Sequence, residues 1–379
     1  MTTSNSASGP YAQRIEAAKR RLRDGAGDAI VLFPSNNLLY TTGFDESPGE
    51  RHLFLVIPAD GDPVFFAPAL YETQLREETT VADLRTWTDS DDPADRLRTL
   101  LAELDLRDGH LLVDDEMWAL FTQDLREAAP EATFGLASEV LADLRVRKDE
   151  AELDAMRRAA DVADAVVDDL RALGDDAIGM SETALAEYVE DRLEAHGGSG
   201  VSFATIVGAG PNGAKPHYHH GETEIQPGEP VVLDFGTRVD GYPSDQTRTL
   251  VFGDEPDDTV REVHDLVREA QHAGVDAVEP GVTAADVDRA AREVIEDAGY
   301  GDEFIHRTGH GVGLDVHEEP FIVAGNDRDL EPGMVFSVEP GIYLPDEFGV
   351  RIEDLVVVTE DGCERLNTTD RGWKTAGPN

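Results

Sequence analysis

The stretch VVLDFGTRVDGYPSDQTRTLVF (Val231–Phe252) places two aspartates in an otherwise apolar β-hairpin pattern. Asp234 interrupts the strand-like run VVLDF, and Asp245 follows eleven residues later, beyond the turn-like VDGYPS. Strands usually exclude aspartate, and a buried carboxylate needs a partner or a metal ion. If the hairpin folds about Val239–Asp240, the two aspartates are cross-strand neighbours about 5 Å apart, where like charges repel. A divalent cation between them would remove that repulsion.

A second hairpin repeats this arrangement farther along the chain. Glu339 lies in FSVEPG and Glu353 in VRIED, on either side of the turn-rich PDEFG (Pro345–Gly349). These glutamates become cross-strand neighbours if the hairpin centres on Asp346. Any one of the four carboxylates could fall in a hairpin by chance, because acidic residues are abundant in this chain. Four at matched positions indicate a site that can hold two metal ions about 3.5–4 Å apart, as in metal-assisted hydrolysis.

The elements around the two hairpins recur in the same order at a nearly constant offset. Ser181, a good helix N-cap, precedes its counterpart Thr283 by 102 residues, and Asp234 precedes Glu339 by 105. The order helix, helix, strand, hairpin therefore indicates an internal duplication. We predict an α+β domain whose halves are related by a pseudo-two-fold axis and close over one curved sheet, with the site between them.

The first part of the chain shows a different pattern. Short apolar runs such as AIVLF (Ala29–Phe33) and LFLVI (Leu53–Ile57) alternate with helix-like segments, which is typical of an α/β domain. The charged segment LRVRKDEAE (Leu144–Glu152) then leads into a long amphipathic helix. We therefore predict two domains, residues 1–145 and 146–379.

The charge of the chain limits its function classes. Asp and Glu number 79 against 32 Lys and Arg, which gives a net charge of −47 at pH 7. Such a surface repels phosphate backbones and anionic lipids, so we expect neither a nucleic acid nor a membrane as a partner. Only four of the bases are lysines, while 40% of the residues are hydrophobic, and this combination favours a folded, halophilic protein over a disordered one. An acidic enzyme from an ordinary cytosol is the alternative.

The single cysteine, Cys363, excludes an internal disulfide and fits a reducing compartment. The N-terminal MTTSNSASGP lacks a signal-peptide pattern, and no apolar run approaches the roughly 20 residues that span a bilayer. We expect a cytoplasmic protein.

Histidines beside glycines supply further candidate ligands. HRTGHGVGLDVHEEP (His306–Pro320) contains three histidines, and glycines flank the middle one, His310. Glycine lets the backbone approach closely, and a neutral imidazole binds transition-metal ions. PHYHHG (Pro216–Gly221) adds His217, while the two histidines after it are interpreted as exposed residues without a role.

In these motifs the sequence resembles the metal-dependent peptidases of the pita-bread fold, and among them the Xaa-Pro peptidases, prolidase and aminopeptidase P. VVLDFG, SDQTRT, HRTGHGVGLDVHEEP, SVEPG and GVRIED stand in family order and at family spacing. The first part of the chain, with PSNNLLYTTGF, is similar to the creatinase-like N-terminal domain of those enzymes. The resemblance implies a creatinase-like α/β domain followed by a pita-bread catalytic domain.

The resemblance also implies the residues of the site. It assigns the metal ligands to Asp234, Asp245, His310, Glu339 and Glu353. His217 and His317 match histidines that contact the substrate, and Glu339 matches the group that moves the proton of the attacking water. Arg351, on the same strand face as Glu353, would orient a carboxylate. Two divalent ions are expected, Mn²⁺ first, with Co²⁺ or Zn²⁺ as alternatives.

The implied reaction is hydrolysis of the peptide bond between an N-terminal residue and proline, in small peptides, by a homodimer. Many prolidases carry an arginine directly after the HE.P motif, where this chain has Phe321. A dipeptidase and an aminopeptidase that acts on longer Xaa-Pro peptides are therefore both open. The other hypotheses are a methionine aminopeptidase, a metal-free creatinase-type hydrolase and an inactive binding protein of the same fold. The N-terminal domain disfavours the first of these, and the complete ligand set disfavours the second.

Overall fold

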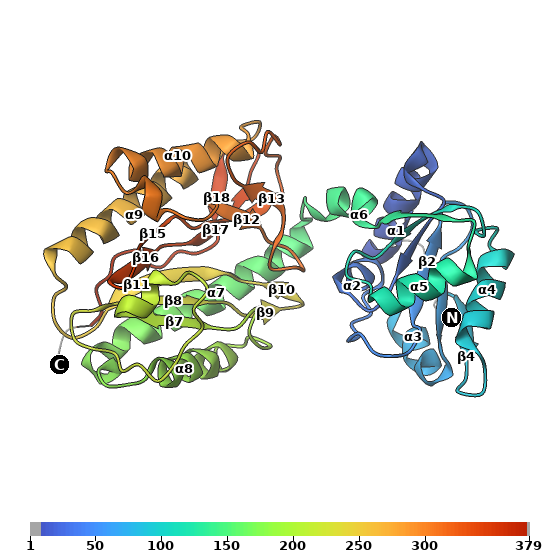
Figure 1. The fold of residues 1–379 in the computed structure, drawn as a ribbon, viewed down its shortest axis with the longest axis horizontal. Helices are drawn as coiled ribbons and strands as arrows, with labels where there is room; N and C mark the ends of the chain where they lie inside the picture. Colours follow the sequence, from blue (N-terminus) through green and yellow to red (C-terminus); the bar gives the residue numbers. More distant parts are fainter. Residues whose placement is uncertain (1–8, 377–379) are drawn as a thin grey trace, which may run out of the picture. The chain divides into compact units, whose positions relative to one another are not determined.

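The computed structural model describes residues 9–376, and the chain divides between Arg145 and Val146 into two compact units (Figure 1). Among the described residues, no helix combines the length and the apolar character that crossing a bilayer would require.

The first unit is built on one mixed six-stranded sheet in the order β4-β3-β2-β1-β5-β6. Its strands are β1 (Ala29–Leu32), β2 (Phe54–Pro58), β3 (Val64–Pro68), β4 (Asp83–Trp87), β5 (His110–Val113) and β6 (Thr133–Leu136). Its helices are α1 (Pro10–Arg21), α2 (Asn36–Thr42), α3 (Glu72–Glu78), α4 (Pro93–Glu103), α5 (Ala119–Ala128) and α6 (Ser138–Arg145). Strand β1 pairs antiparallel with β2 and parallel with β5.

Alternating side chains along β1 divide the core of this unit into two layers. Ala29 and Val31 pack in the cluster that includes α4 and α5, whereas Ile30 and Leu32 pack in the cluster that includes α1 and α6. Successive strand side chains point to opposite faces, so a wholly apolar strand needs helices on both. The α/β class predicted for this part of the chain is confirmed.

The second unit contains two helix pairs and several short antiparallel sheets. Its helices are α7 (Glu150–Leu173), α8 (Glu182–Ala195), α9 (Asp258–Asp276) and α10 (Ala284–Asp297). One sheet has the order β11-β8-β7, from β7 (Ile206–Ala209), β8 (Pro230–Phe235) and β11 (Gln246–Val251). A second has the order β13-β12-β14-β17-β18, from β12 (Gly309–Gly311), β13 (Glu318–Ile322), β14 (Val335–Val338), β17 (Asp354–Val358) and β18 (Cys363–Arg365).

Two small hairpins complete this unit, β9 (Arg238–Val239) with β10 (Tyr242–Pro243), and β15 (Gly341–Leu344) with β16 (Phe348–Arg351). Short helical turns along the whole chain are η1 (Leu22–Ala26), η2 (Ala69–Tyr71), η3 (Gly174–Ala177), η4 (Gly210–Ala214) and η5 (Gly301–Glu303).

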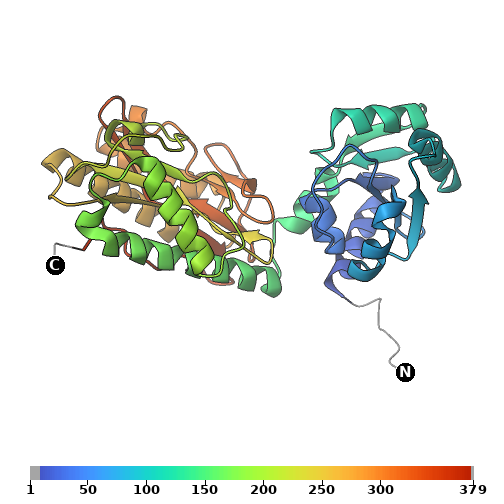
Figure 2. The same ribbon diagram turned by 90° about the horizontal axis from the view of Figure 1, so that it is seen from below.

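Each helix pair of the second unit covers its own group of strands. Helices α7 and α8 share one core cluster with β7, β8 and β11. Helices α9 and α10 pack on β13 to β17 in two further clusters. Figure 1 shows the two pairs on opposite sides of the strands, and Figure 2, seen from below, has α8 in front of them. The order helix, helix, strand, hairpin thus occurs twice, as the sequence predicts.

The first carboxylate hairpin has a different register from the predicted one. Asp234 pairs with Thr247 and not with Asp245, which lies just before β11. The turn lies at Asp240–Gly241, whose φ angles of 50° and 84° suit a two-residue hairpin loop. The prediction that the two aspartates face each other across the strands is therefore wrong.

The second carboxylate hairpin has the predicted centre. Strand β15 pairs with β16, and β14 with β17, in a register that centres on Asp346. Glu339 and Glu353 lie between these two pairs of strands, where the chain passes from one sheet to the next. Pro340 has no N–H group, so it cannot extend the ladder of β14 beyond Glu339.

Candidate metal centre

Three of the predicted ligands lie together inside the second unit. Ligand atoms of Asp245, His310 and Glu353 all lie within 4.8 Å of one another. These residues are 4%, 4% and 2% exposed. Two carboxylates and an imidazole that converge away from water form a donor set for a divalent cation.

The other two predicted ligands border this group. Oε1 of Glu339 lies 3.3 Å from Nε2 of His310, and Oδ2 of Asp245 lies 3.7 Å from the same nitrogen. Asp234 accepts a hydrogen bond at Oδ2 from Arg351, while its buried Oδ1 has no hydrogen-bond partner among residues 9–376. An orphaned carboxylate oxygen in such a place fits a metal ligand.

The ring orientation of His310 suits the same role. Its Nδ1 lies 3.2 Å from the carbonyl oxygen of Gly311, so Nδ1 carries the proton and donates it. Burial, with a further contribution from His317, lowers the pKa of His310 to about 3, so the imidazole is neutral. The lone pair of Nε2 therefore faces carboxylate oxygens, an arrangement that a shared cation stabilises.

The surroundings of the cluster disfavour the ionised form of its carboxylates. Burial first, and then repulsion from neighbouring carboxylates, raises the pKa of Asp245 and of Glu353 well above the usual range. Burial also raises the pKa of Glu339 to about 7, although Arg351 opposes the shift. Four carboxylates with one arginine leave a negative charge that divalent ions would balance.

Arg351 connects the carboxylates of the two hairpins. It is 3% exposed, and its Nη2 donates to Oδ2 of Asp234 at 2.6 Å. Its Nε donates to Oγ1 of Thr247 at 3.0 Å, and Thr247 in turn donates to Oε2 of Glu353 at 2.7 Å. Its Nη1 donates to the hydroxyl of Tyr343 at 3.0 Å. The guanidinium therefore orients carboxylates on both sides of the cluster.

Sequence reasoning missed three residues of this network, Thr247, Ser337 and Tyr343. Ser337 Oγ accepts from the N–H of His310 and donates to Oε1 of Glu339, both at 3.1 Å. Ser337 was detectable in principle, because it is a polar residue of the apolar strand β14, two positions from the predicted ligand Glu339, and thus shares its face. Thr247 lies in the polar run QTRT of β11 and does not interrupt an apolar pattern. Tyr343 gave no comparable signal.

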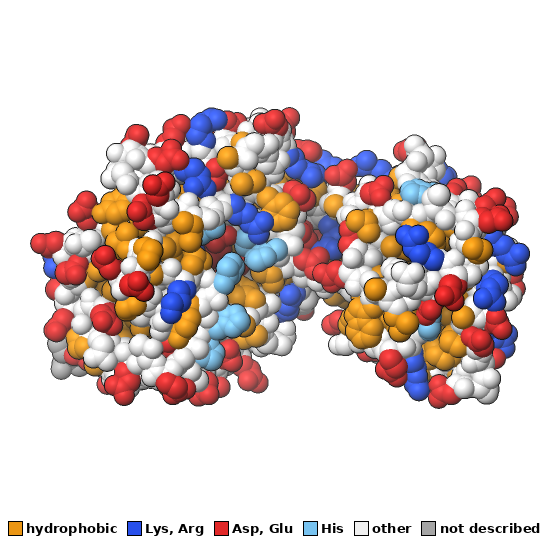
Figure 3. Space-filling model, viewed as in Figure 1, with side chains coloured by type: hydrophobic (Ala, Val, Ile, Leu, Met, Phe, Trp, Pro, Cys, Tyr) orange, Lys and Arg blue, Asp and Glu red, His pale blue; other side chains and the backbone are white. Residues whose placement is uncertain are grey.

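The two histidines expected to contact the substrate lie at the solvent edge of the cluster. His317 is exposed, and the centre of its ring lies 4.0 Å from that of His310. His217 is also exposed and acts electrostatically on Asp234 and His317. Figure 3 shows histidine side chains gathered on this face of the second unit. Both are therefore available to a molecule that arrives from solvent.

Comparison with known proteins identifies the family. Residues 154–360 match metallopeptidase family M24, and residues 14–147 match the creatinase/prolidase N-terminal domain. The chain belongs to metallopeptidase family M24. It is 41% identical over 363 residues to a protein of Mycobacterium tuberculosis described as probable dipeptidase PepE, with 94% of each chain covered. It is 38% identical over 370 residues to an Xaa-Pro dipeptidase of Lactobacillus helveticus, with 95% of this chain and 98% of that one covered.

A solved structure agrees with these relatives. The prolidase of Thermococcus sibiricus matches this M24 chain with a TM-score of 0.92 and 38% identity, over 97% of this chain and 100% of that one. The predicted fold, a creatinase-like domain followed by a pita-bread domain, is confirmed, as is the predicted class of metallopeptidase. Membership of M24 implies divalent metal ions, and the donor set of Asp245, His310 and Glu353 fits them.

Proposed function

We propose that this M24 metallopeptidase hydrolyses the bond between an N-terminal residue and a following proline. The observation that carries the proposal is the buried convergence of carboxylates on the lone pair of His310. The substrate class is supported by the relatives described as dipeptidases and Xaa-Pro dipeptidases. We assign two metal ions to a set of five ligands, Asp234, Asp245, His310, Glu339 and Glu353.

Bound divalent ions supply Lewis acidity toward the scissile carbonyl and toward water. The residues of the chain position the reactants and move the proton. Glu339, whose Oε1 is held by Ser337, accepts a proton from the attacking water and delivers it to the prolyl nitrogen, which cannot leave unprotonated. His317, at the solvent edge, donates a hydrogen bond to the oxygen of the scissile carbonyl. His217, at the same edge, lies beside the scissile bond.

We propose Mn²⁺ as the metal, because four carboxylates and one imidazole form an oxygen-rich site, with Co²⁺ and Zn²⁺ as alternatives. Reconstitution of the metal-free protein with each ion, followed by hydrolysis of an Xaa-Pro dipeptide, ranks the three. The highest rate with Zn²⁺ would overturn this assignment.

We also propose that dipeptides are preferred to longer Xaa-Pro peptides, with the aminopeptidase as the alternative. The guanidinium of Arg307 lies 4.4 Å from the ring centre of Phe321 and, among the described residues, makes no hydrogen bond or ion pair. It acts electrostatically on His317 and Glu339, so it lies beside the cluster. A guanidinium beside the cluster whose N–H groups make no hydrogen bond within the described residues can bind the carboxylate of a C-terminal proline.

The experiment compares kcat/KM for Ala-Pro, Ala-Pro amide and Ala-Pro-Ala. We expect Ala-Pro to be favoured about tenfold over the amide, since one charge-assisted hydrogen bond contributes about 1.5 kcal/mol. Arg307→Gln should remove this preference, whereas Arg107→Gln, at an exposed position of the first unit, should leave it intact. Equal rates for Ala-Pro and its amide would contradict the dipeptide preference, and no hydrolysis of any of the three would contradict the function itself.

A homodimer, a cytoplasmic location and a halophilic origin stay predictions from the sequence. Light scattering of the purified protein tests the first, and a mass of one chain would contradict it.

A further inference from the structure

Glu182 is a buried carboxylate outside the metal cluster. It is the first residue of α8, directly after the N-cap Ser181, and it is 0% exposed. A carboxylate in the first turn of a helix is stabilised by the helix dipole, but a wholly buried one also needs hydrogen-bond donors. Its donors come from one segment, which we call the His217 loop and define as residues 209–221.

Glu182 accepts four hydrogen bonds from the two ends of the His217 loop. Oε1 accepts from the N–H of Ala209 at 2.9 Å and from Nδ2 of Asn212 at 2.9 Å. Oε2 accepts from the hydroxyl of Tyr218 at 2.8 Å and from the N–H of Gly221 at 3.0 Å. One oxygen thus holds the start of the loop, and the other holds its end.

The packing around this carboxylate leaves little freedom. A side chain on Gly221 would place its Cβ 2.6 Å from the hydroxyl of Tyr218, so any larger residue there would displace that hydroxyl. The backbone of the loop end also bonds to α8, because the N–H of Thr183 donates to the carbonyl of Gly221 at 2.9 Å. The loop is therefore closed on Glu182 at both ends.

The middle of the same loop reaches the metal cluster. The carbonyl oxygen of Pro216 lies 3.4 Å from Nη1 of Arg351, and the next residue is His217. A Cβ on Gly349 of β16 would lie 2.0 Å from the carbonyl oxygen of Gly213, so the loop packs directly on the strand that carries Arg351. His217 itself is exposed, so its place beside the cluster depends on how the loop is held.

We propose that Glu182 is a positioning residue for the hydrolytic reaction, whose four hydrogen bonds fix the His217 loop and thereby hold His217 beside Asp234 and Arg351. This inference rests on the proposed function, because it assigns Glu182 no contact with the substrate. A misplacement of a reacting group by about 1 Å can reduce a rate about 100-fold, so the effect should appear mainly in kcat.

The first test is a mutant cycle on the metal-loaded enzyme. Glu182→Gln puts an amide N–H₂ where two donors already converge, so at least one oxygen loses its partners. We expect kcat for Ala-Pro to fall about 10- to 100-fold in this variant and to change less than twofold when His217→Ala is already present. A merely structural role would give the same fold-loss in both backgrounds, and that outcome would overturn the proposal, as would wild-type kcat in Glu182→Gln.

Two further variants are needed, one as a matched control and one in case Glu182→Gln does not fold. Glu187→Gln changes an exposed glutamate of the same helix and should leave kcat unchanged. Tyr218→Phe removes one of the four donors without removing the carboxylate, so it should lower kcat by a smaller factor, again only when His217 is present. This variant decides the question if Glu182→Gln does not fold, and an equal loss with His217→Ala present would contradict the proposal.

The second test does not depend on substrate. Hydrogen exchange of the metal-free protein should show faster exchange for the amides of Ala209 and Gly221 in Glu182→Gln, while the amides of α10 exchange as in the wild type. Unchanged exchange at both amides would contradict the proposal that Glu182 fixes the His217 loop, even if peptide hydrolysis were altered. The converse result is a wild type that cleaves no Xaa-Pro peptide together with a variant that still shows this faster exchange. That result would contradict the proposed function, but it would support the role of Glu182 in fixing the His217 loop.

Discussion

Asp114, in the first unit, shows what burial does to a carboxylate that forms no ion pair with any of residues 9–376. It is 2% exposed and accepts hydrogen bonds from Oγ of Ser35 at 2.6 Å and from Nδ2 of Asn37 at 3.4 Å. Burial is the largest effect and raises its pKa to about 6, although these bonds oppose the shift. Because the folded pKa is raised, the free energy of unfolding falls as the pH rises from about 4 to 6, and the loss persists above that range.

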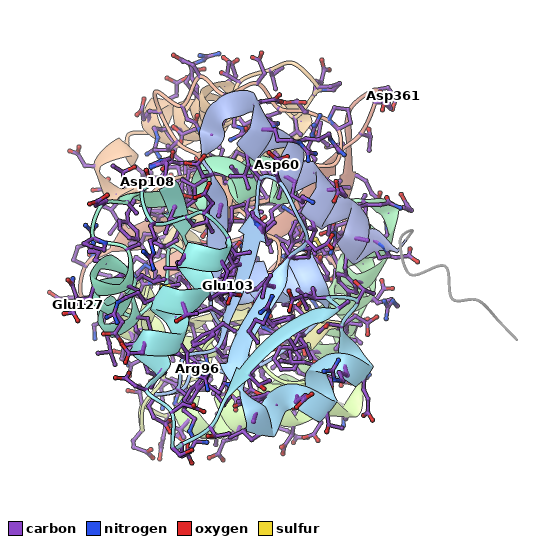
Figure 4. All side chains as sticks on the ribbon, turned by 90° about the vertical axis from the view of Figure 1, so that its right-hand side faces the viewer. Asp60, Arg96, Glu103, Asp108, Glu127 and Asp361 are labelled. Atoms are coloured by element: carbon purple, nitrogen blue, oxygen red, sulfur yellow. The ribbon has the colours of Figure 1, made fainter. Side chains whose placement is uncertain are left out.

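Asp114→Asn should therefore stabilise the protein at neutral pH. A shift of about two pKa units corresponds to about 3 kcal/mol at pH 7.5 and about 1 kcal/mol at pH 4.5. Urea unfolding at both values, at one salt concentration, measures the difference. Asp108→Asn, an exposed position labelled in Figure 4, should change neither value. A lower stability of Asp114→Asn at pH 7.5, or an equal gain at both values, would contradict the account of Asp114.

Among the elements, β11 and β17 share a buried ion cluster directly behind the metal centre. Asp354, next to Glu353, is 0% exposed and accepts hydrogen bonds from Arg248 at 2.9 Å, Arg365 at 2.9 Å and Arg371 at 2.6 Å. Burial opposes ionisation, but these arginines hold the pKa of Asp354 below its usual range. Arg248 also donates to the carbonyl oxygen of Glu353, so the cluster ties the two strands together beside a predicted ligand.

Asp354→Asn should destabilise the protein strongly. Removal of one partner from a buried ion pair leaves uncompensated charge and typically costs about 3–5 kcal/mol. Urea unfolding of the metal-free protein measures this cost without any contribution from bound ions. Asp361→Asn, at an exposed position after β17, should shift stability by less than about 0.5 kcal/mol. Similar values for the two variants would show that the cluster does not hold the strands together.

The parts of the fold that depend on local chemistry could be predicted, and those that depend on turn geometry could not. Ser181 and Thr283 cap their helices as the sequence indicates, because a cap needs only a side-chain oxygen and nearby N–H groups. The hairpin at Asp240–Gly241 was misjudged, although Asp-Gly is a strong signal for a two-residue turn.

The site was predictable to the extent that its residues break a pattern. Asp234 and Glu339 interrupt apolar strands, and that interruption revealed them. Thr247 and Tyr343 fit the composition of strands, so the bonds that they make with Arg351 became visible only in three dimensions. The loop that carries His217 depends on Glu182, which sequence reasoning treated only as part of a helix.

The charge of the whole molecule divides into the few carboxylates of the metal centre and a large acidic surface. The chain carries a net charge of −47, and many of its arginines form exposed pairs, such as Arg85 with Glu103. Figure 4 labels Glu103 of this pair. Exposed pairs contribute little to stability, so they do not offset the repulsion between the remaining carboxylates. Molar salt shortens the Debye length from about 10 Å to about 3 Å and screens that repulsion.

Raising KCl from 0.1 to 3 M at pH 7.5 should therefore raise the midpoint of thermal unfolding. The increase should be about 10 °C if screening adds about 3–5 kcal/mol to the free energy of unfolding. The same increase in KCl near pH 4.3, the isoelectric point, should have a much smaller effect, because little net charge is left to screen. A midpoint at pH 7.5 that stays constant or falls with KCl would contradict the halophilic interpretation.

The most direct test of the metal centre combines Mn²⁺ titration with hydrolysis of Ala-Pro. Calorimetry of the metal-free wild type should show two ions bound per chain, and hydrolysis should depend on them. Asp245→Asn should lose at least one ion and about 100-fold or more in kcat/KM, whereas Asp254→Asn, at an exposed position, should behave as the wild type. Hydrolysis without added metal, or full metal binding and full activity in Asp245→Asn, would contradict the claim that these carboxylates form the active centre of an Xaa-Pro peptidase.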